Sequence, residues 1–296
     1  MRKDRVIHNA FKDWGVVYFQ VFSIIIVFLL FLYPGIAGRT KPFLKVLLSW
    51  DLSDDLLSVG AYGSFLIALV VSILLLKTFN EKNSHRTLNT GNYYHNHTYF
   101  GYWICSNILG FGKCNLYLVP APMQYKLVIR DTFEEYVYEN VCHEIKGDDI
   151  VDCKPEGNIR EHIKGNIVNL IISDTYVITN DDIPSEVEQY ENIIISRTIK
   201  HDKMRYKSES LIKTVSTVVR QLPSYVDTIN VLGTLNPYNC YRIVNEIFKT
   251  GCTGAIENLI VYKQDTKTWK FVSKGERIYG KQLKEINYER RKDVEL

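Results

Sequence analysis

The chain has 296 residues and a formal net charge of +3, from 36 lysine and arginine residues against 33 aspartate and glutamate residues. A chain of this length can hold two domains of ordinary size. The small excess of positive charge argues against binding to duplex nucleic acid, because that requires a concentrated basic face.

Two uncharged, apolar runs stand near the start of the chain, at about residues 14–38 and 56–76. Each run is long enough to cross the hydrocarbon core of a bilayer as a helix. A buried core helix is the alternative for each, but two such runs in succession favour transmembrane helices. We therefore predict a membrane segment over residues 1–84 and a soluble domain over residues 85–296.

Basic residues on either side of these runs indicate how the chain is oriented. The first run is longer than the apolar part of a usual signal peptide, so we expect a retained anchor rather than a cleaved signal. Basic residues precede the first run and follow the second, which favours a cytoplasmic N-terminus and a cytoplasmic C-terminal domain. They are Arg2, Lys3, Arg5 and Lys12, then Lys77, Lys82 and Arg86.

All six cysteines lie in the predicted soluble domain, and none of their spacings is Cys-x-x-Cys. This spacing disfavours a zinc site. In a reducing cytosol we expect these cysteines to be small buried hydrophobic residues. The alternative is an extracellular domain with three disulfides, in which Asn96 would pass as a glycosylation site.

The first part of the soluble domain gives weak local signals. Residues 78–98 are polar and rich in turn formers, so they are predicted to tether the domain to the membrane. Residues 116–119 and 126–130 are predicted to be strands. A short helix is predicted at residues 131–143 and a loop at residues 148–157.

The second part alternates between short apolar runs and helical periodicity. Strands are predicted at residues 167–173, at residues 192–196, around Val231, and at residues 257–262 and 269–272. Helices are predicted at residues 207–221 and from Pro237, with Asn236 as the N-cap of the second. This order predicts βαβ units and a largely parallel sheet with helices over its faces.

A candidate ligand site follows from that sheet, because open parallel sheets bind ligands at the carboxyl ends of their strands. Three segments leave strands there, and the turn before Pro237 offers backbone N–H groups and the positive end of a helix dipole, which suits a phosphate. We predict a nucleotide-binding site composed of Asp174, Thr175, Tyr176, Arg197, Lys200, Lys203, Gly233, Thr234, Asn236 and Tyr238. An ordinary strand-to-helix connection with nothing bound is the alternative.

Residues 169–187 (NLIISDTYVITNDDIPSEV) and residues 228–272 resemble the SAVED domain, a fusion of two CARF-like Rossmannoid halves. The family's pattern is met by Thr175, Pro237, Val261, Tyr262 and Trp269. The resemblance covers about residues 165–275, and residues 100–165 are expected to form the first CARF-like half. The chain departs from the pattern at Tyr176, where the family usually has His, and at Asn245 and Glu246, where it often has Gly.

The resemblance implies a fold and a function. The fold would be a membrane-anchored α/β protein, with two transmembrane helices followed by a Rossmann-like SAVED domain. The function would be that of an anti-phage CBASS effector in the bacterial inner membrane. A cyclic di- or trinucleotide made by a partner CD-NTase would activate it, without a cofactor, and drive homo-oligomerisation. The clustered helices would then disrupt the lipid membrane.

A membrane-anchored, nucleotide-processing enzyme is the second function that the residues leave open. The sequence has no phosphate-binding P-loop, no Gly-x-Ser-x-Gly elbow, no His-Glu-x-x-His motif and no kinase motifs. A general base would have to lie near the phosphate-facing turn, and His201 and Asp174 are the candidates. We expect a ligand sensor and no enzymatic activity.

Overall fold

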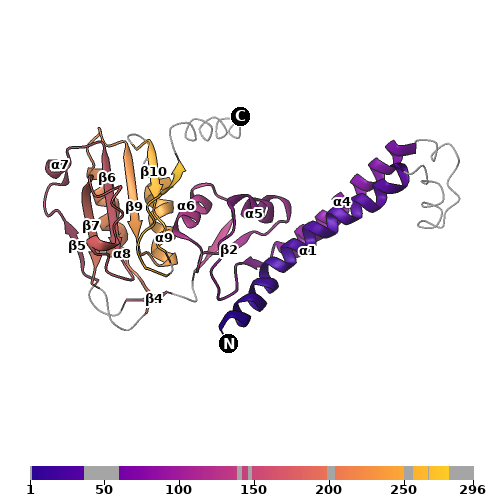
Figure 1. The fold of residues 1–296 in the computed structure, drawn as a ribbon, viewed down its shortest axis with the longest axis horizontal. Helices are drawn as coiled ribbons and strands as arrows, with labels where there is room; N and C mark the ends of the chain where they lie inside the picture. Colours follow the sequence, from indigo (N-terminus) through magenta and orange to yellow (C-terminus); the bar gives the residue numbers. More distant parts are fainter. Residues whose placement is uncertain are drawn as a thin grey trace. The chain divides into compact units, whose positions relative to one another are not determined.

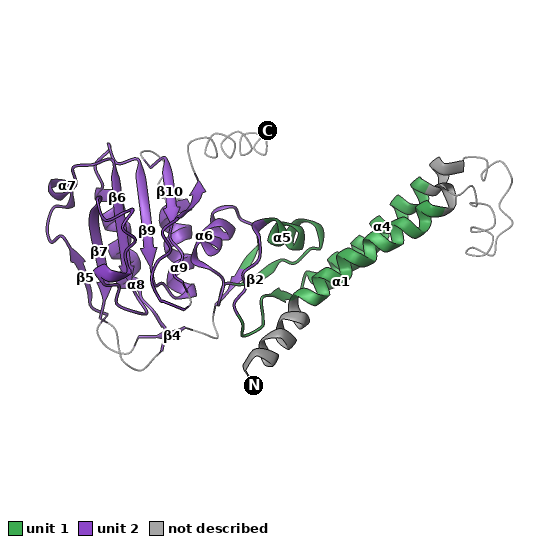
Figure 2. Cartoon of the chain, in the orientation of Figure 1, with its two compact units in different colours: residues 1–93, 100–115, 133–135 green, residues 94–99, 116–132, 136–296 purple. Residues whose placement is uncertain are grey.

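The chain is described by a computed structural model that covers residues 2–36, 60–138, 142–145, 149–198, 204–249, 256–265 and 267–279. It divides into two compact units (Figure 2). Unit 1 comprises residues 1–93, 100–115 and 133–135, and unit 2 comprises residues 94–99, 116–132 and 136–296.

Unit 1 is built around two long helices, α1 (Arg2–Ile36) and α4 (Gly60–Asn83), which pack against each other (Figure 1). In the described part of the chain, one stretch of helix, Trp14–Tyr33 of α1, is long and apolar enough to cross a membrane. The second predicted span begins at about residue 56, outside the described residues, and continues as helix α4. Its crossing of a membrane is not confirmed.

The rest of unit 1 is a small folded region next to the ends of these helices. Strands β1 (Thr87–Leu88), β2 (Lys113–Asn115) and β3 (Glu135–Val137) form a sheet in that order, with β1 parallel to β2. Helix α5 (Tyr99–Trp103) continues directly into a π-helix, η1 (Ile104–Ile108).

The chain leaves η1 through Gly110, which has a positive φ of 75°. A Cβ at Gly110 would overlap the side chain of Asn80, so both the backbone conformation and the space require glycine.

The predicted polar tether over residues 78–98 is wrong. Its residues extend α4 and form β1, and Leu88 and Asn89 are buried.

Unit 2 is an α/β structure around a six-stranded sheet with the strand order β11-β10-β9-β6-β7-β5. The four central strands are parallel, and both edge strands run antiparallel to their neighbours. The strands are β5 (Val151–Lys154), β6 (Ile167–Ser173), β7 (Glu191–Arg197), β9 (Thr228–Gly233), β10 (Asn258–Val261) and β11 (Glu276–Tyr279). The predicted parallel α/β sheet is confirmed.

A row of hydrogen-bonded amides crosses the centre of this sheet, with Asn169 and Asn230 buried and Asn192 exposed. Asn169 donates to Asn192 Oδ1 at 2.8 Å and accepts from Asn230 Nδ2 at 3.0 Å. The three residues lie directly opposite one another on β7, β6 and β9. Because a one-residue slip would separate these amides, the row favours a single strand register.

Helices and loops cover the sheet. Helix α8 (Glu209–Gln221) packs against β5 and β7, and α6 (Ala121–Ile129) packs against β10 and β11. Helix α9 (Pro237–Ile243) and its continuation η3 (Val244–Lys249) contact both α6 and α8. A separate apolar cluster packs on Ile171 and Leu232 and contains Ile183, Val187, Tyr262 and Phe271.

Several local predictions are wrong. Residues 126–130 end helix α6 instead of forming a strand. A run this short does not show whether its apolar residues repeat with the period of a helix or of a strand, and Pro120 and Pro122 favour a helix start. The predicted helix at residues 131–143 is replaced by β3 and the start of β4 (His143–Glu144). Part of the predicted loop at residues 148–157 is strand β5.

The predicted division into two CARF-like halves is not confirmed. In the described part of the chain, unit 2 contains one six-stranded sheet, and residues 100–165 do not build a second. They contribute to unit 1, α6, β5 and the short helix α7 (Ile159–His162). A small parallel pair of β4 and β8 (Tyr206–Lys207) completes unit 2.

Candidate functional site

The parallel strands β6, β7 and β9 end at the same edge of the sheet, and the predicted site residues gather there. β6 ends just before Asp174, β7 ends at Arg197, and β9 ends just before Thr234. β6 lies between β7 and β9. The topology therefore brings together residues that are far apart in the sequence, as the strand pattern predicts.

Asp174 and Arg197 form a buried ion pair at the centre of this edge. The Arg197 Nε donates to Asp174 Oδ1 at 2.9 Å, and Nη2 donates to the backbone carbonyl of Asp174 at 2.9 Å. Asp174 is 0% exposed and Arg197 is 6% exposed. The guanidinium predicted to meet a phosphate thus already holds a carboxylate of the chain itself.

The second carboxylate oxygen of Asp174 accepts three further hydrogen bonds. They come from the backbone N–H of Asn236 (3.0 Å) and from the side-chain amides of Asn236 (2.8 Å) and Asn239 (2.9 Å). Burial raises the pKa of the Asp174 carboxyl, and the Asn236 N–H and the Arg197 charge oppose that rise. Since each of these partners is a donor, the geometry fits the ionised carboxylate.

Asp174 also occupies the place where a phosphate was expected, at the start of α9. Asn236 caps this helix by accepting from the Asn239 N–H at 3.0 Å, and its own N–H is used by Asp174. The Thr234 N–H donates to the Ile172 carbonyl at 3.0 Å. A carboxylate at a helix N-terminus is favoured by the same dipole that favours a phosphate.

Thr234 connects the turn after β9 to the turn after β6. Its hydroxyl accepts from the N–H groups of Asp174 (3.2 Å) and Tyr176 (3.4 Å) and donates to the Tyr176 carbonyl (2.8 Å). Thr175 returns two bonds to the Thr234 carbonyl, from its N–H at 3.0 Å and its hydroxyl at 2.5 Å. The two turns therefore move as one piece.

The outer side of the site carries exposed aromatic rings. Tyr176 is 44% exposed and contacts Trp269, which is 55% exposed, with ring centroids 5.4 Å apart in an edge-to-face arrangement. An exposed aromatic pair beside polar turns is suited to stacking on a nucleobase.

Tyr238 lies in a separate group of charged and aromatic side chains on α8 and α9. Its hydroxyl donates to Glu209 at 3.0 Å and accepts from Arg242 at 2.6 Å, and Arg242 also binds Glu209 at 2.8 Å. Burial raises the pKa of Glu209, but hydrogen bonds from Arg242 and Tyr238 outweigh this effect, so the pKa lies below its ordinary value. Lys207 lies 5.3 Å from the Tyr238 ring centroid.

The structure thus places eight of the predicted site residues at one end of the sheet. Asp174, Thr175, Arg197, Thr234 and Asn236 form the hydrogen-bonded network, which Tyr176 joins through its backbone alone. Tyr238 lies outside the network, and Gly233 ends β9 opposite Ile172. Lys200 and Lys203 lie outside the described residues. The ligand-binding role of all ten stays a prediction.

Sequence reasoning missed three neighbours of this site, which are Asn239, Trp269 and Arg242. Asn239 could have been found from its position, because it is a second asparagine three residues after the N-cap Asn236. Trp269 was assigned to a strand, although only Phe271 of that segment forms a bridge, to Gln264. No local pattern identified Arg242.

The five described cysteines carry free thiols, and four of them are buried. Cys142 donates to Asn236 Oδ1 at 3.3 Å and so joins the network. Burial raises the pKa of the Cys142 thiol, which favours its neutral, donating form. Cys252 lies outside the described residues.

Two solved structures that resemble the chain are of Acinetobacter baumannii Cap4, described as a SAVED/CARF-domain containing receptor. One holds the cyclic trinucleotide 3'3'3'-cAAA, with 9% identity and a TM-score of 0.39, and the other holds 2'3'3'-cAAA, with 8% identity and a TM-score of 0.41. The matches cover 61% and 76% of this chain but 42% and 59% of those chains. At these TM-scores the likeness carries no argument about the site.

No curated protein sequence was found to match the chain. A family profile does match it, over residues 2–278, and its description is "SMODS- and Ubiquitin system-associated 2TM effector domain". The match includes both long helices and all of the described part of unit 2 except Tyr279. The chain therefore belongs to the family of SMODS- and ubiquitin system-associated 2TM effector domains.

Proposed function

We propose that this protein is an anti-phage CBASS effector that is activated by a cyclic oligonucleotide and then disrupts the bacterial inner membrane. The observation that carries the proposal is family membership over residues 2–278, in a family described as a two-transmembrane effector domain. The apolar stretch Trp14–Tyr33 supports a membrane anchor. Both α1 and the helix that contains α4 would cross the membrane, with both chain ends in the cytoplasm.

The ligand would bind at the carboxyl ends of β6, β7 and β9 in unit 2. Because Asp174, Arg197, Thr234 and Asn236 are buried and bonded to one another, they would position the turns rather than grip the phosphates. Direct contacts would come from the outer residues, with a nucleobase on the Tyr176 ring, and from Thr175, Gly233, Tyr238, Lys200 and Lys203. No cofactor would be needed.

Activation would follow from mass action. A ligand that contacts two neighbouring copies stabilises the assembled state alone and shifts the population towards it. Assembly of unit 2 would bring the membrane helices of several copies together and so damage the bilayer.

A binding and leakage experiment tests this function. The full chain, reconstituted in vesicles loaded with a dye, is incubated with a set of cyclic di- and trinucleotides. We expect one of them to bind, to be recovered intact, to increase the size of the complex and to release the dye. A ligand that is consumed would favour the enzyme, and a protein that binds none of them would end the proposal.

A matched pair of variants tests the site. Tyr176→Ala is expected to weaken ligand binding by roughly five- to 150-fold, since a stacked base contributes about 1–3 kcal/mol. Val177→Ala, at the exposed neighbouring position, is the control and should bind as the unaltered protein does. Equal affinities for both variants would place the base elsewhere.

The enzyme alternative gains no specific support from the site geometry. Of the two candidate bases, His201 lies outside the described residues. Asp174 faces inward, and its oxygens already accept from Arg197, Asn236 and Asn239. A carboxylate held in this way is poorly placed to take a proton from a substrate.

A further inference from the structure

A long uncharged segment, most of which belongs to unit 1, is explained by neither the anchor nor the ligand site. Residues 87–112 include no aspartate, glutamate, lysine or arginine. Soluble surfaces usually mix charges of both signs, so such a segment on a protein surface is unusual. It is also rich in aromatic residues, namely Tyr93, Tyr94, Tyr99, Phe100, Tyr102, Trp103 and Phe111.

Helix α5 and η1 display two of these rings outward. Phe100 is 66% exposed and Trp103 is 40% exposed, and their rings are stacked with centroids 6.0 Å apart. Aromatic side chains, tryptophan above all, concentrate at the level of lipid headgroups. An exposed pair on a short uncharged helix fits that environment better than it fits water.

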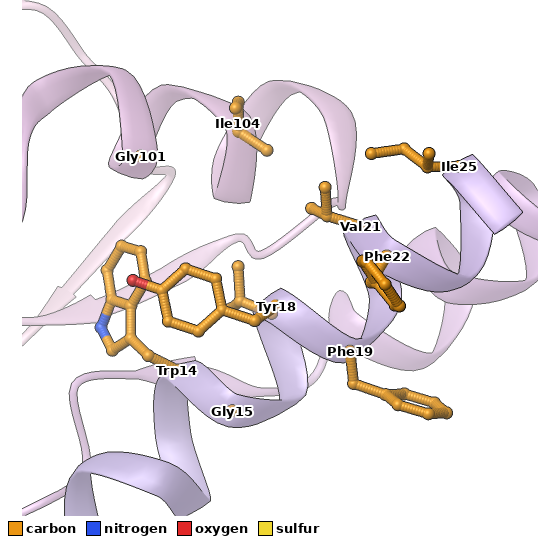
Figure 3. A pocket seen from close by; sticks show the side chains of 10 residues that line it. Trp14, Gly15, Tyr18, Phe19, Val21, Phe22, Ile25, Gly101 and Ile104 are labelled. Atoms are coloured by element: carbon orange, nitrogen blue, oxygen red, sulfur yellow. The ribbon is translucent and has the colours of Figure 1, made fainter.

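An apolar cavity of about 590 Å³ lies between α5–η1 and α1 (Figure 3). This volume is within the range of sites that hold small ligands. Gly101 and Ile104 line it on one side. The opposite side belongs to α1 and consists of Trp14, Gly15, Val17, Tyr18, Phe19, Val21, Phe22 and Ile25.

The indole nitrogen of Trp14, which lines the cavity, is already bonded away from it. Trp14 Nε1 donates to Asn89 Oδ1 at 3.0 Å, and the Trp14 ring packs edge-on against Tyr102 at 5.3 Å. Apart from the Tyr18 hydroxyl, the lining side chains are apolar (Figure 3). Such a lining suits a flexible hydrocarbon and offers little to a polar ligand.

The cavity is continuous with the stretch of α1 that can cross a membrane. Its α1 residues, from Trp14 to Ile25, are the first half of Trp14–Tyr33. Tyr18, Phe19 and Phe22 are exposed, so the cavity opens onto the face that lipid would cover. Nearby basic residues complement anionic headgroups. Lys82, in the last turn of α4, and Arg86, just after it, are exposed, and Arg5 and Lys12 precede Trp14 in the sequence.

We propose that α5–η1 is a third, non-spanning contact with the bilayer and that the cavity behind it holds the acyl chain of a phospholipid. Phe100 and Trp103 would lie at the boundary between headgroups and acyl chains, as in interfacial helices. The proposal rests on the proposed crossing of the membrane by α1 but does not depend on a nucleotide ligand.

Fluorescence quenching tests the membrane contact. A full-length variant that keeps Trp103 as its one tryptophan (Trp14→Phe, Trp50→Phe and Trp269→Phe) is reconstituted in vesicles that contain phosphatidylglycerol. Phospholipid with bromine on the acyl chain near the headgroup should reduce Trp103 fluorescence roughly twofold, and bromine near the chain end should reduce it less.

A second reporter separates this proposal from that of the anchor. Leu29→Trp, made with no other tryptophan in the chain, places the probe in the middle of the candidate span. Quenching at Leu29→Trp without quenching at Trp103 would overturn the interfacial contact and leave the anchor intact. Loss of quenching at both positions would overturn the anchor as well.

A cavity-filling variant tests the acyl-chain site. Val21→Phe adds bulk to the cavity wall, and Val70→Phe adds the same bulk at an exposed position of α4 that does not line it. We expect severalfold less phospholipid to remain with purified Val21→Phe in mild detergent, measured by native mass spectrometry. Equal lipid contents of the two variants would show that no chain occupies the cavity.

Discussion

Both units join segments that are distant in the sequence through neutral amides, but unit 2 adds a buried charged pair. In unit 1 the groups are neutral amides. Gln20 and Asn83 exchange two hydrogen bonds, of 3.1 and 2.9 Å, and Asn83 also donates to the Leu109 carbonyl at 2.8 Å. In unit 2 the charged pair of Asp174 and Arg197 joins the ends of β6 and β7.

This difference follows from the cost of burial. A buried amide needs its hydrogen bonds but no opposite charge, whereas a buried carboxylate needs both. In unit 1, Gln20 lies within the candidate membrane span Trp14–Tyr33, where a neutral amide costs less to bury than a charge. Unit 2 surrounds the Asp174 carboxylate, after β6, with N–H donors from Arg197 at the end of β7 and from Asn236 and Asn239 after β9, and thereby joins the ends of three strands.

The largest expected effect is at Arg197. Arg197→Met leaves the Asp174 charge buried without a counter-ion and should lower the local stability of unit 2 by about 3–5 kcal/mol. Faster hydrogen exchange of the β6 and β9 amides, followed by mass spectrometry, measures this. Arg242→Met removes an exposed pair with Glu209 and should cost less than about 1 kcal/mol. Similar losses of stability for the two variants would contradict the expected difference between the buried pair and the exposed pair.

The amide pair of unit 1 should give the next largest effect. Asn83→Leu leaves Nε2 and Oε1 of Gln20, and the Leu109 carbonyl, without these hydrogen-bond partners. This change should lower the stability of unit 1 by about 2–4 kcal/mol. The double variant Gln20→Leu with Asn83→Leu removes the unsatisfied side chain and should recover part of the loss. Thermal unfolding in detergent, followed by the helical circular dichroism signal, compares them. A double variant less stable than Asn83→Leu would count against the amide explanation.

A smaller effect is expected from the hydroxyl that joins two turns of unit 2. Thr234→Val removes the acceptor for the N–H groups of Asp174 and Tyr176 and should cost about 1–3 kcal/mol. Thr234→Ser keeps the hydroxyl and serves as the control. Hydrogen exchange at the Tyr176 amide should rise in the valine variant alone, and a similar rise in the serine variant would point to the lost methyl group instead.

The smallest expected effect is a dependence on pH that unit 2 should show more strongly than unit 1. Burial, together with the neighbouring His95, lowers the pKa of His97 to about 4, from about 6.5 in the unfolded chain. The unfolded state therefore binds more protons between these values, so this contribution is complete above pH 6.5 and is lost as the pH falls towards 4. For a half-buried group we expect about 1 kcal/mol.

Hydrogen exchange of unit 2 at several pH values, corrected for the intrinsic rates, measures this loss. His97→Gln should remove most of the pH dependence, while the amides of α1 and α4 change little. A pH dependence that persists in His97→Gln would assign it to other groups.

The sequence predicted the centre of unit 2 better than its margins. Ile167–Ser173 and Thr228–Gly233 are short, mostly apolar runs with clear ends, so their identity as parallel strands was readable. Strand β5 could not be predicted, because its sequence Val-Asp-Cys-Lys has no apolar run. It is a strand because it pairs with β7. Residues 126–130 were misread since a run of that length fits a strand and a helix equally well.

The grouping of the site residues at one end of the sheet was predicted, but their internal bonding was not. Strand ends identify which residues meet at an edge, and that placed Asp174, Arg197 and Asn236 together. No local pattern tells that Arg197 would bind Asp174 rather than a ligand, because the two are 23 positions apart and meet through the sheet. At the start of α9, where the sequence predicts a phosphate, the structure has the Asp174 carboxylate.

The edge strand β5 also limits how copies of this protein can polymerise. It has four residues, two of which, Asp152 and Lys154, are exposed and charged, and it is followed by Pro155, which has no N–H to offer. Short, charged edges of this kind resist the addition of a foreign strand. A filament of this protein would therefore have to be joined by side chains, or by a molecule held between neighbours, and not by a continuous β-sheet through this edge.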